Sequence, residues 1–335
     1  MSKLSVKVAG VAVLYGALTS FFYSPFLQEL HRFKFLLPLS VFFAALGAFF
    51  LSRKWVVTFS GSVLSGILYG FGSFFLGLAS YHPFCSVLAG AVPWLFLPSV
   101  YAWKRVHKLL AVLLLALPVA AIAGFFALTG LLGFYPMASR EMLGISDLFG
   151  LVFPIVFIKH TGFAFGFYHA ALATILMGLF ISFEARKWGL LALLAGGMVM
   201  GFLPPVFGIS PLMWLCLPAI CLAVAGGVGM QGLVCAGRGD KGWILAVGAI
   251  MLGLCAASFF LAFRYVLVFA GLGEGYSRIF AFSGKMYAMG AGLAAVLFCL
   301  IYLNIRSHWL RWLLIWLCVG ADILFSVRHV LGWVL

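Results

Sequence analysis

The sequence predicts an all-α fold, a polytopic integral membrane helix bundle of about 10–12 transmembrane helices joined by short loops. Two observations predict it. Of the 335 residues, 65% are hydrophobic and 8% are charged, whereas soluble domains are roughly half apolar and a quarter charged. Apolar runs long enough to cross a bilayer also follow one another along the whole chain. These proportions exclude a soluble globular protein, because one core could not bury so much apolar surface.

Five spans are predicted before residue 134. The first follows a short basic segment that includes Lys3, and we expect it to be a retained helix because no small-residue cleavage site follows it. Later apolar runs are separated by basic pairs such as Arg53-Lys54 and Lys104-Arg105. The predicted spans are 1–25, 36–51, 56–80, 84–103 and 109–133.

Six spans are predicted after residue 161. Arg186-Lys187 separates the first two, and Pro204-Pro205 ends the second because proline cannot continue a helix. The predicted spans are 162–183, 188–203, 212–235, 242–270, 284–303 and 310–333. We therefore expect one transmembrane domain over 1–335, with spans in 1–133 and 162–335.

Residues 134–161 form the longest irregular stretch and are predicted to be an outer-face loop. Its apolar segment 148–158 is interpreted as re-entrant or interfacial. A twelfth span there would move Arg186-Lys187 to the outside and reverse the charge asymmetry of the second half.

The basic residues predict the orientation. With eleven spans and a cytoplasmic N-terminus, thirteen of the 21 Lys and Arg fall in cytoplasmic loops, seven fall in outer loops, and Arg264 lies within a span. This asymmetry follows the positive-inside rule. Short loops and the lack of a targeting segment favour a multi-pass protein of a bacterial-type inner (plasma) membrane.

The formal net charge of +14 is attributed to loop anchoring and to contact with membrane lipids. Because the basic residues occur singly or in pairs at the ends of apolar runs, nucleic-acid binding is not expected. Other membrane proteins remain candidate partners.

Glycine spacing predicts close contacts between helices. Gly66 and Gly70, like Gly197 and Gly201, place small residues one turn apart. Such spacing lets helix backbones approach closely in lipid. The same spacing or clustering occurs at Gly162 and Gly166, and at Gly226, Gly227 and Gly229.

Three polar residues interrupt apolar spans and are intramembrane candidates. Asp322 lies near the middle of the last span, and His329 follows about two turns later on nearly the same helix face. Such a stripe suits proton coupling or a positively charged substrate group, and a structural ion pair is an equal alternative. Arg264 is expected to pair with Asp322, to bind an anion or to extend toward the outer headgroups.

A second group of candidates is predicted at the outer face. An acid, a base and cations there would suit a membrane-embedded enzyme for a lipid-linked substrate, with His as general base and Arg binding phosphate. The alternative is the solvated rim of a helix bundle. The outer-face candidates are Arg140, Glu141, Lys159, His160 and His169.

No catalytic residue is assigned, because HExxH, GxSxG and P-loop spacings do not occur. We predict no metal site and no cofactor. A haem held by His169 and His329 is retained as an alternative, since bis-histidine ligation needs imidazoles on facing helices.

The leading functional hypothesis is a transporter or permease that moves a small or lipid-like solute. Its signatures, namely short loops, glycine packing and one buried acid, extend over the whole chain. The alternatives are a membrane-embedded enzyme or haem/quinone-type redox subunit that uses the outer-face residues, and a structural subunit of a membrane complex.

Overall fold

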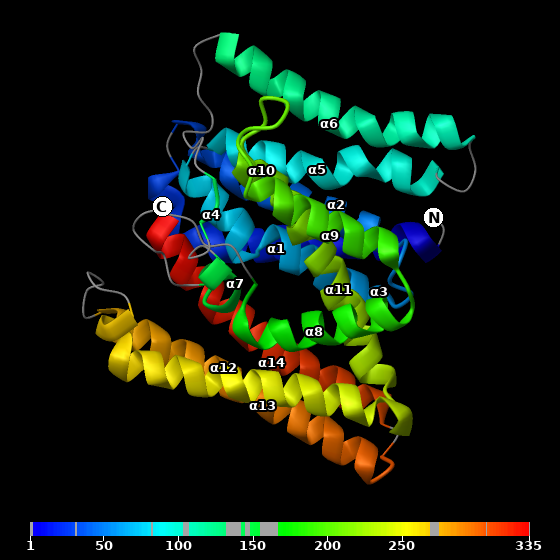
Figure 1. The fold of residues 1–335 in the computed structure, drawn as a ribbon, viewed down its shortest axis with the longest axis vertical. Coiled ribbons are helices and arrows are strands. Elements are labelled where there is room, and N and C mark those ends of the chain that lie inside the picture. Colours follow the sequence, from blue (N-terminus) through cyan, green and yellow to red (C-terminus); the bar gives the residue numbers. More distant parts are fainter. Residues whose placement is uncertain are drawn as a thin grey trace.

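The computed structural model describes residues 3–30, 32–81, 83–102, 107–131, 142–144, 148–154, 167–268, 275–305 and 307–334. Within them, seven helices are long and apolar enough to cross a membrane, and four shorter apolar helices accompany them. The described part holds no β-strand apart from one isolated bridge between Val206 and Ile209. The protein is therefore an all-α polytopic membrane helix bundle, as predicted (Figure 1).

The described residues of the first part of the chain form six α-helices. A 3₁₀ segment over Ser24–Glu29 and another over Arg32–Phe35 join the first two. Each predicted span of this part has a helical counterpart. The helices are α1 (Lys3–Tyr23), α2 (Leu36–Ser52), α3 (Phe59–Gly70), α4 (Ser73–Tyr81), α5 (Pro83–Ala102) and α6 (Lys108–Leu131).

The described residues of the second part form eight α-helices, of which two are single turns. A 3₁₀ turn over Arg238–Asp240 leads into the twelfth helix. The helices are α7 (Phe149–Val152), α8 (His169–Glu184), α9 (Trp188–Gly201), α10 (Pro211–Trp214), α11 (Cys216–Cys235), α12 (Lys241–Val268), α13 (Gly275–Tyr302) and α14 (His308–Val334).

The predicted span 56–80 is not one continuous helix. It is divided into α3 and α4 at Phe71, whose φ of −101° and ψ of 5° are not helical. Glycines on both sides of Phe71 lower the helix propensity there. The apolar pattern continues through the break over Phe59–Leu78, so the sequence alone indicates a single span.

The span predicted at 284–303 begins nine residues earlier, at Gly275. Arg278 was expected before this span and Lys285 at its outer end, but both are exposed on one face of the longer helix α13. The opposite face buries Phe280 and Tyr287. Long basic side chains near a helix end can extend to the headgroups, so they do not end the helix.

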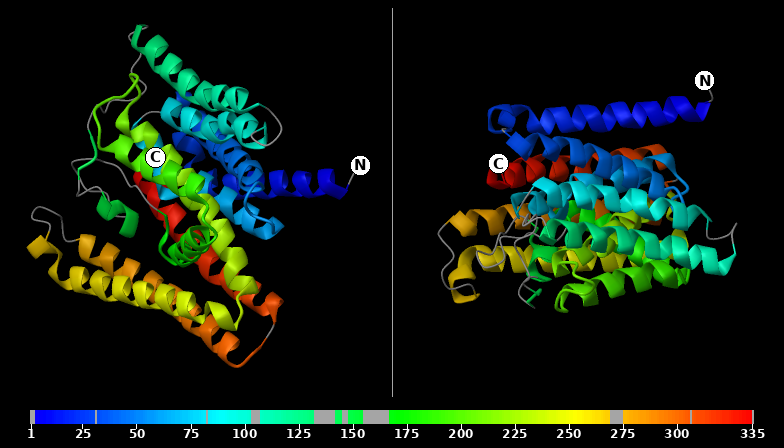
Figure 2. Two further views of the ribbon diagram at one scale, coloured as in Figure 1. Left: turned by 45° about the vertical axis from the view of Figure 1, so that its right-hand side comes forward. Right: turned by 90° about the horizontal axis from the view of Figure 1, so that it is seen from above.

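The centre of the bundle is formed by the broken helix α3–α4 and by α11. The apolar window within Phe59–Leu78 is fully buried, which no other long span achieves in the described part. In Figure 1, the α12–α13 pair lies at one side of the molecule and α5–α6 at the other. Figure 2 shows that the long helices run roughly along a common direction. The start of α1 and the end of α14 lie at opposite ends of the bundle.

Small residues bring the central helices into backbone contact. A Cβ atom added to Gly229 of α11 would lie 1.7 Å from the Thr174 carbonyl oxygen of α8. A Cβ atom on Gly178 of α8 would lie 1.8 Å from the Ala225 carbonyl oxygen of α11. Because no side chain fits there, the predicted role of the glycine cluster in helix packing is confirmed at this contact.

One end of the bundle, here called the basic end, collects helix termini that carry Lys and Arg. The Gln231 side chain near the end of α11 accepts hydrogen bonds from the backbone of Val57 and Thr58 before α3. The Lys241 ammonium lies 4.8 Å from the centre of the Tyr302 ring. The basic end is defined by Lys7, Arg53, Lys54, Arg186, Lys187, Arg238, Lys241 and Arg311.

Candidate functional site

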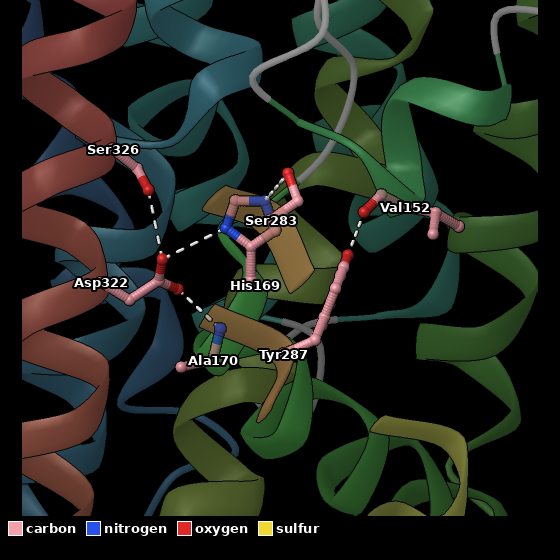
Figure 3. A network of polar contacts seen from close by, with 7 residues as sticks. All are labelled: Val152, His169, Ala170, Ser283, Tyr287, Asp322 and Ser326. Atoms are coloured by element: carbon pink, nitrogen blue, oxygen red, sulfur yellow. Dashed lines mark hydrogen bonds and ion pairs between the residues drawn. The ribbon is translucent and has the colours of Figure 1, made fainter. Parts of the chain in front are cut away.

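The candidate site is a buried polar network centred on Asp322. This residue lies near the middle of α14 and is 0% exposed. The backbone N–H of Ala170 donates to Asp322 Oδ2 at 2.6 Å, and the Ser326 hydroxyl donates to Oδ1 at 3.1 Å. Figure 3 shows these contacts converging on the carboxyl group from α8 and α14. A carboxyl group is therefore held inside the helix bundle by directed hydrogen bonds.

His169 connects Asp322 to a third helix. Its Nδ1 atom lies 3.3 Å from Asp322 Oδ1, and its Nε2 atom lies 2.9 Å from the Ser283 hydroxyl of α13 (Figure 3). All three side chains are 0% exposed. His169–Asp322 is also the one ion pair found among the described residues. The network thus joins α8, α13 and α14 through ionisable groups.

Tyr287 forms an aromatic wall beside the histidine. Its ring packs edge-on to His169 with 4.9 Å between the ring centres. Its hydroxyl donates a hydrogen bond to the Val152 carbonyl of α7, and Phe153 packs against the same tyrosine ring. The short helix α7, which lies in the segment predicted to be re-entrant, is therefore attached directly beside the polar network. Its re-entrant character stays a prediction.

The break in the central helix is linked to the same place. The Tyr168 hydroxyl donates to the Phe71 carbonyl at 2.6 Å, which satisfies an oxygen at the end of α3. Tyr168 directly precedes His169 at the start of α8. Tyr168 therefore links the break between α3 and α4 to the N-terminus of α8, directly beside the His169–Asp322 pair.

The position of Asp322 has a clear electrostatic reason. Helix α8 has 16 residues and so spans about 24 Å, less than the roughly 30 Å of a hydrocarbon core. Its first backbone N–H groups are buried and have no partner within the helix. Asp322 accepts one of them and places negative charge at the positive end of the helix dipole. A side chain from α14 thereby caps α8.

The network can hold one additional proton without changing its framework. When His169 is neutral and carries its proton on Nδ1, it donates to Asp322 and accepts from the Ser283 hydroxyl at Nε2. When a second proton binds Nε2, the imidazolium donates to Ser283 instead, because a hydroxyl can either donate or accept. The same contacts are therefore compatible with either protonation state of the imidazole.

Asp322 faces the protein interior and has polar partners, as expected, but the partner is His169 and not Arg264 or His329. Arg264 is exposed on α12 and has non-helical φ and ψ of −129° and 17°. His329 lies partly buried two turns further along α14. Neither residue hydrogen-bonds Asp322.

The outer-face group is only partly described. Arg140, Glu141, Lys159 and His160 lie outside the described residues. His169 was grouped with them by its place in the sequence, whereas the structure places it against Asp322. The grouping treated 162–183 as one span, but α8 begins at His169 itself. Both ring nitrogens of His169 have partners, so haem ligation would require one of these contacts to be released.

Sequence reasoning missed Ser283, Ser326 and Tyr168. Nothing in the sequence around Ser283 or Tyr168 distinguishes them from the other serines and tyrosines of the chain. One signal was available for Ser326, which follows Asp322 by one helical turn and so lies within reach of its carboxyl group. Ser283 was hidden because the start of α13 was predicted one residue after it.

Comparisons with protein-family models, with curated proteins and with solved structures find no match to this chain. The class of protein is therefore defined by its own fold, that of a multi-pass helical membrane protein with an ionisable pair buried between its helices.

Proposed function

We propose that this protein is a proton-coupled membrane transporter for a small or lipid-like solute, and that His169 and Asp322 form its coupling site. The observation that carries the proposal is the burial of this pair where three helices meet beside a broken central helix. Ionisable groups inside a membrane are costly and typically mark proton or substrate pathways.

The backbone around the pair supports the same proposal. Secondary transporters commonly bind substrate and coupling ions near mid-membrane, where interrupted helices supply free backbone groups. Here the α3–α4 break is held by Tyr168, and the N-terminus of α8 is held by Asp322. A second proton on His169 would strengthen its attraction to Asp322, and the loss of that proton would weaken the link between α8 and α14. That change offers a physical route from proton binding to helix movement.

A second candidate function rests on the order of atoms in the network. Ser283 Oγ, His169 Nε2, His169 Nδ1 and Asp322 Oδ1 follow the connectivity of a serine-hydrolase triad. Such an enzyme also needs substrate access and an oxyanion site, and Ser283 is 0% exposed. The closed surroundings favour proton transfer over acyl transfer.

The basic end supports an orientation. We infer that it faces the cytoplasm, because Lys and Arg accumulate on the cytoplasmic side of membrane proteins. The N-terminus would then also be cytoplasmic, and a bacterial-type inner membrane would fit the short loops.

The experiment uses the full chain in proteoliposomes that contain a pH-sensitive dye, challenged with a panel of cationic, neutral and anionic solutes. We expect at least one solute class to drive proton movement in the wild type and not in Asp322→Asn. Arg264→Gln is the control, because Arg264 is exposed and away from the pair. A proton signal that survives Asp322→Asn would contradict the proposal.

Ser283→Ala separates the two candidate functions. A transporter should retain part of its proton movement, because the alanine removes one hydrogen bond and leaves the ionisable pair. A hydrolase would lose its nucleophile, and the wild type would also be labelled at Ser283 by an active-site fluorophosphonate. Labelling of the wild type that disappears in Ser283→Ala would favour the hydrolase.

A further inference from the structure

A cavity of about 390 Å³ lies at the basic end, far along α14 from Asp322. It is formed by the end of α11, the start of the 3₁₀ turn before α12, and the connection between α13 and α14. Its polar lining comes from Arg238, Asn304, His308 and Arg311. No carboxylate belongs to the lining among the described residues, so this part of the cavity carries a concentrated positive charge.

Arg311 is the buried member of this lining. It is 3% exposed, yet it forms no ion pair with any acidic residue of the described chain. Its Nη1 donates to the Ala236 carbonyl at 2.6 Å and its Nη2 to the Ile305 carbonyl at 2.8 Å. Its buried Nε has no hydrogen-bond partner in the described part of the protein. The carbonyl groups anchor the guanidinium but leave its charge without a counter-ion.

The neighbouring groups do not supply that counter-ion. His308 Nδ1 donates to the Val234 carbonyl at 3.1 Å. Asp240, the acid nearest in sequence to Arg238, accepts a hydrogen bond from the Gly237 backbone N–H at 2.8 Å and so closes its own turn. A second cavity of about 240 Å³ shares Cys235 with the first and adds Lys187 to the positive surroundings.

We propose that this cavity binds a phosphate group, supplied either by the headgroup of an anionic lipid or by a free phosphate anion. Arginine forks match phosphate oxygens and form strong charge-assisted hydrogen bonds. Trp309 and Trp312 are exposed beside it on α14. Exposed tryptophans are typical of the membrane–water interface, the depth at which lipid phosphates lie. Basic pockets between helix ends are suited to anionic headgroups.

The test measures the thermal unfolding of the purified full chain in detergent during titration with phosphatidylglycerol, phosphatidylcholine or inorganic phosphate. A ligand that binds only the folded state raises the unfolding temperature, and the rise increases with the logarithm of the ratio of ligand concentration to Kd. Arg238→Gln is the test variant because Arg238 is exposed and its loss should not disturb the fold. Arg186→Gln is the matched control, since Arg186 is exposed at the same end but does not line the cavity.

We expect phosphatidylglycerol to stabilise the wild type more than phosphatidylcholine does, and its apparent affinity to fall about tenfold in Arg238→Gln. Arg186→Gln should behave as the wild type. If inorganic phosphate alone produces the same Arg238-dependent stabilisation and phosphatidylglycerol adds nothing, the ligand is a free phosphate. The proposal is overturned if neither anion gives an Arg238-dependent shift, or if both variants lose affinity equally. None of these outcomes depends on proton coupling at Asp322.

Discussion

Asp322 caps α8, and in the proposed function it would also belong to a proton site, which makes a different chemical demand. As the cap of α8 it needs only an acceptor for the Ala170 N–H. As part of a proton site it needs an ionisable group beside His169. An amide can meet the first demand and not the second, so substitutions at this one residue separate structure from function.

We expect Asp322→Asn to retain most of the stability. The amide oxygen can accept from Ala170, and the amide nitrogen can donate to His169 once the imidazole proton moves to Nε2. Asp322→Ala should instead lower the free energy of unfolding by about 3–5 kcal/mol, because a buried N–H and a buried histidine lose their partner. Unfolding in mixed micelles measures both. Equal destabilisation by the two variants would mean that the charge itself holds the fold.

At the level of elements, the contact between α8 and α11 is set by glycine. This contact fixes the position of the N-terminus of α8, because α8 packs against α11 along much of its length. In lipid, such packing takes the place of the hydrophobic effect between helices. The geometry of the polar network therefore depends on residues that carry no chemistry.

Gly229→Ala should destabilise the protein by about 1–3 kcal/mol, since the new methyl group would overlap the Thr174 carbonyl and force the helices apart. Gly253→Ala is the control, because this glycine of α12 is exposed and has no atom within 4 Å of an added Cβ. It should be neutral or slightly stabilising, as alanine has the higher helix propensity. The midpoint of detergent unfolding compares the two variants. A tolerated Gly229→Ala would contradict the close contact.

For the whole molecule, the described helices leave the two chain ends on opposite sides (Figure 1). The starts of α6, α9, α12 and α14 lie on the same side as the start of α1, and the end of α6 and the start of α8 lie on the other. Chain ends on opposite sides of a membrane require an odd number of crossings. This conclusion does not change when a helix boundary shifts by a few residues.

Reporter tags test this topology directly. Tags after Lys108 and after Lys187 should both report the cytoplasm, and a tag near Arg140 should report the outer side, because a span separates each neighbouring pair of positions. A tag at the C-terminus should likewise report the outer side. If Arg140 and Lys187 report the same side, the segment between α6 and α8 crosses the membrane once more than expected.

The candidate site could be predicted only in part. Asp322 was found because one carboxyl group in an apolar run stands out wherever its partners lie. His169 was recognised as a candidate, but its pairing with Asp322 was not predicted, because the start of α8 depends on a cap supplied by a distant helix. Ser283 gave no signal, since its role exists only through its distance from His169.

The sequence by itself determined the class of fold and the approximate position of every long helix, because the match between an apolar run and the thickness of a bilayer is a local property. Only the tertiary structure decided which helices meet, where the central helix is broken and which partner Asp322 receives. Those features depend on contacts such as Tyr168 with Phe71 and His169 with Asp322. Residues joined in this way are far apart in the chain, so no local sequence pattern indicates that they are in contact.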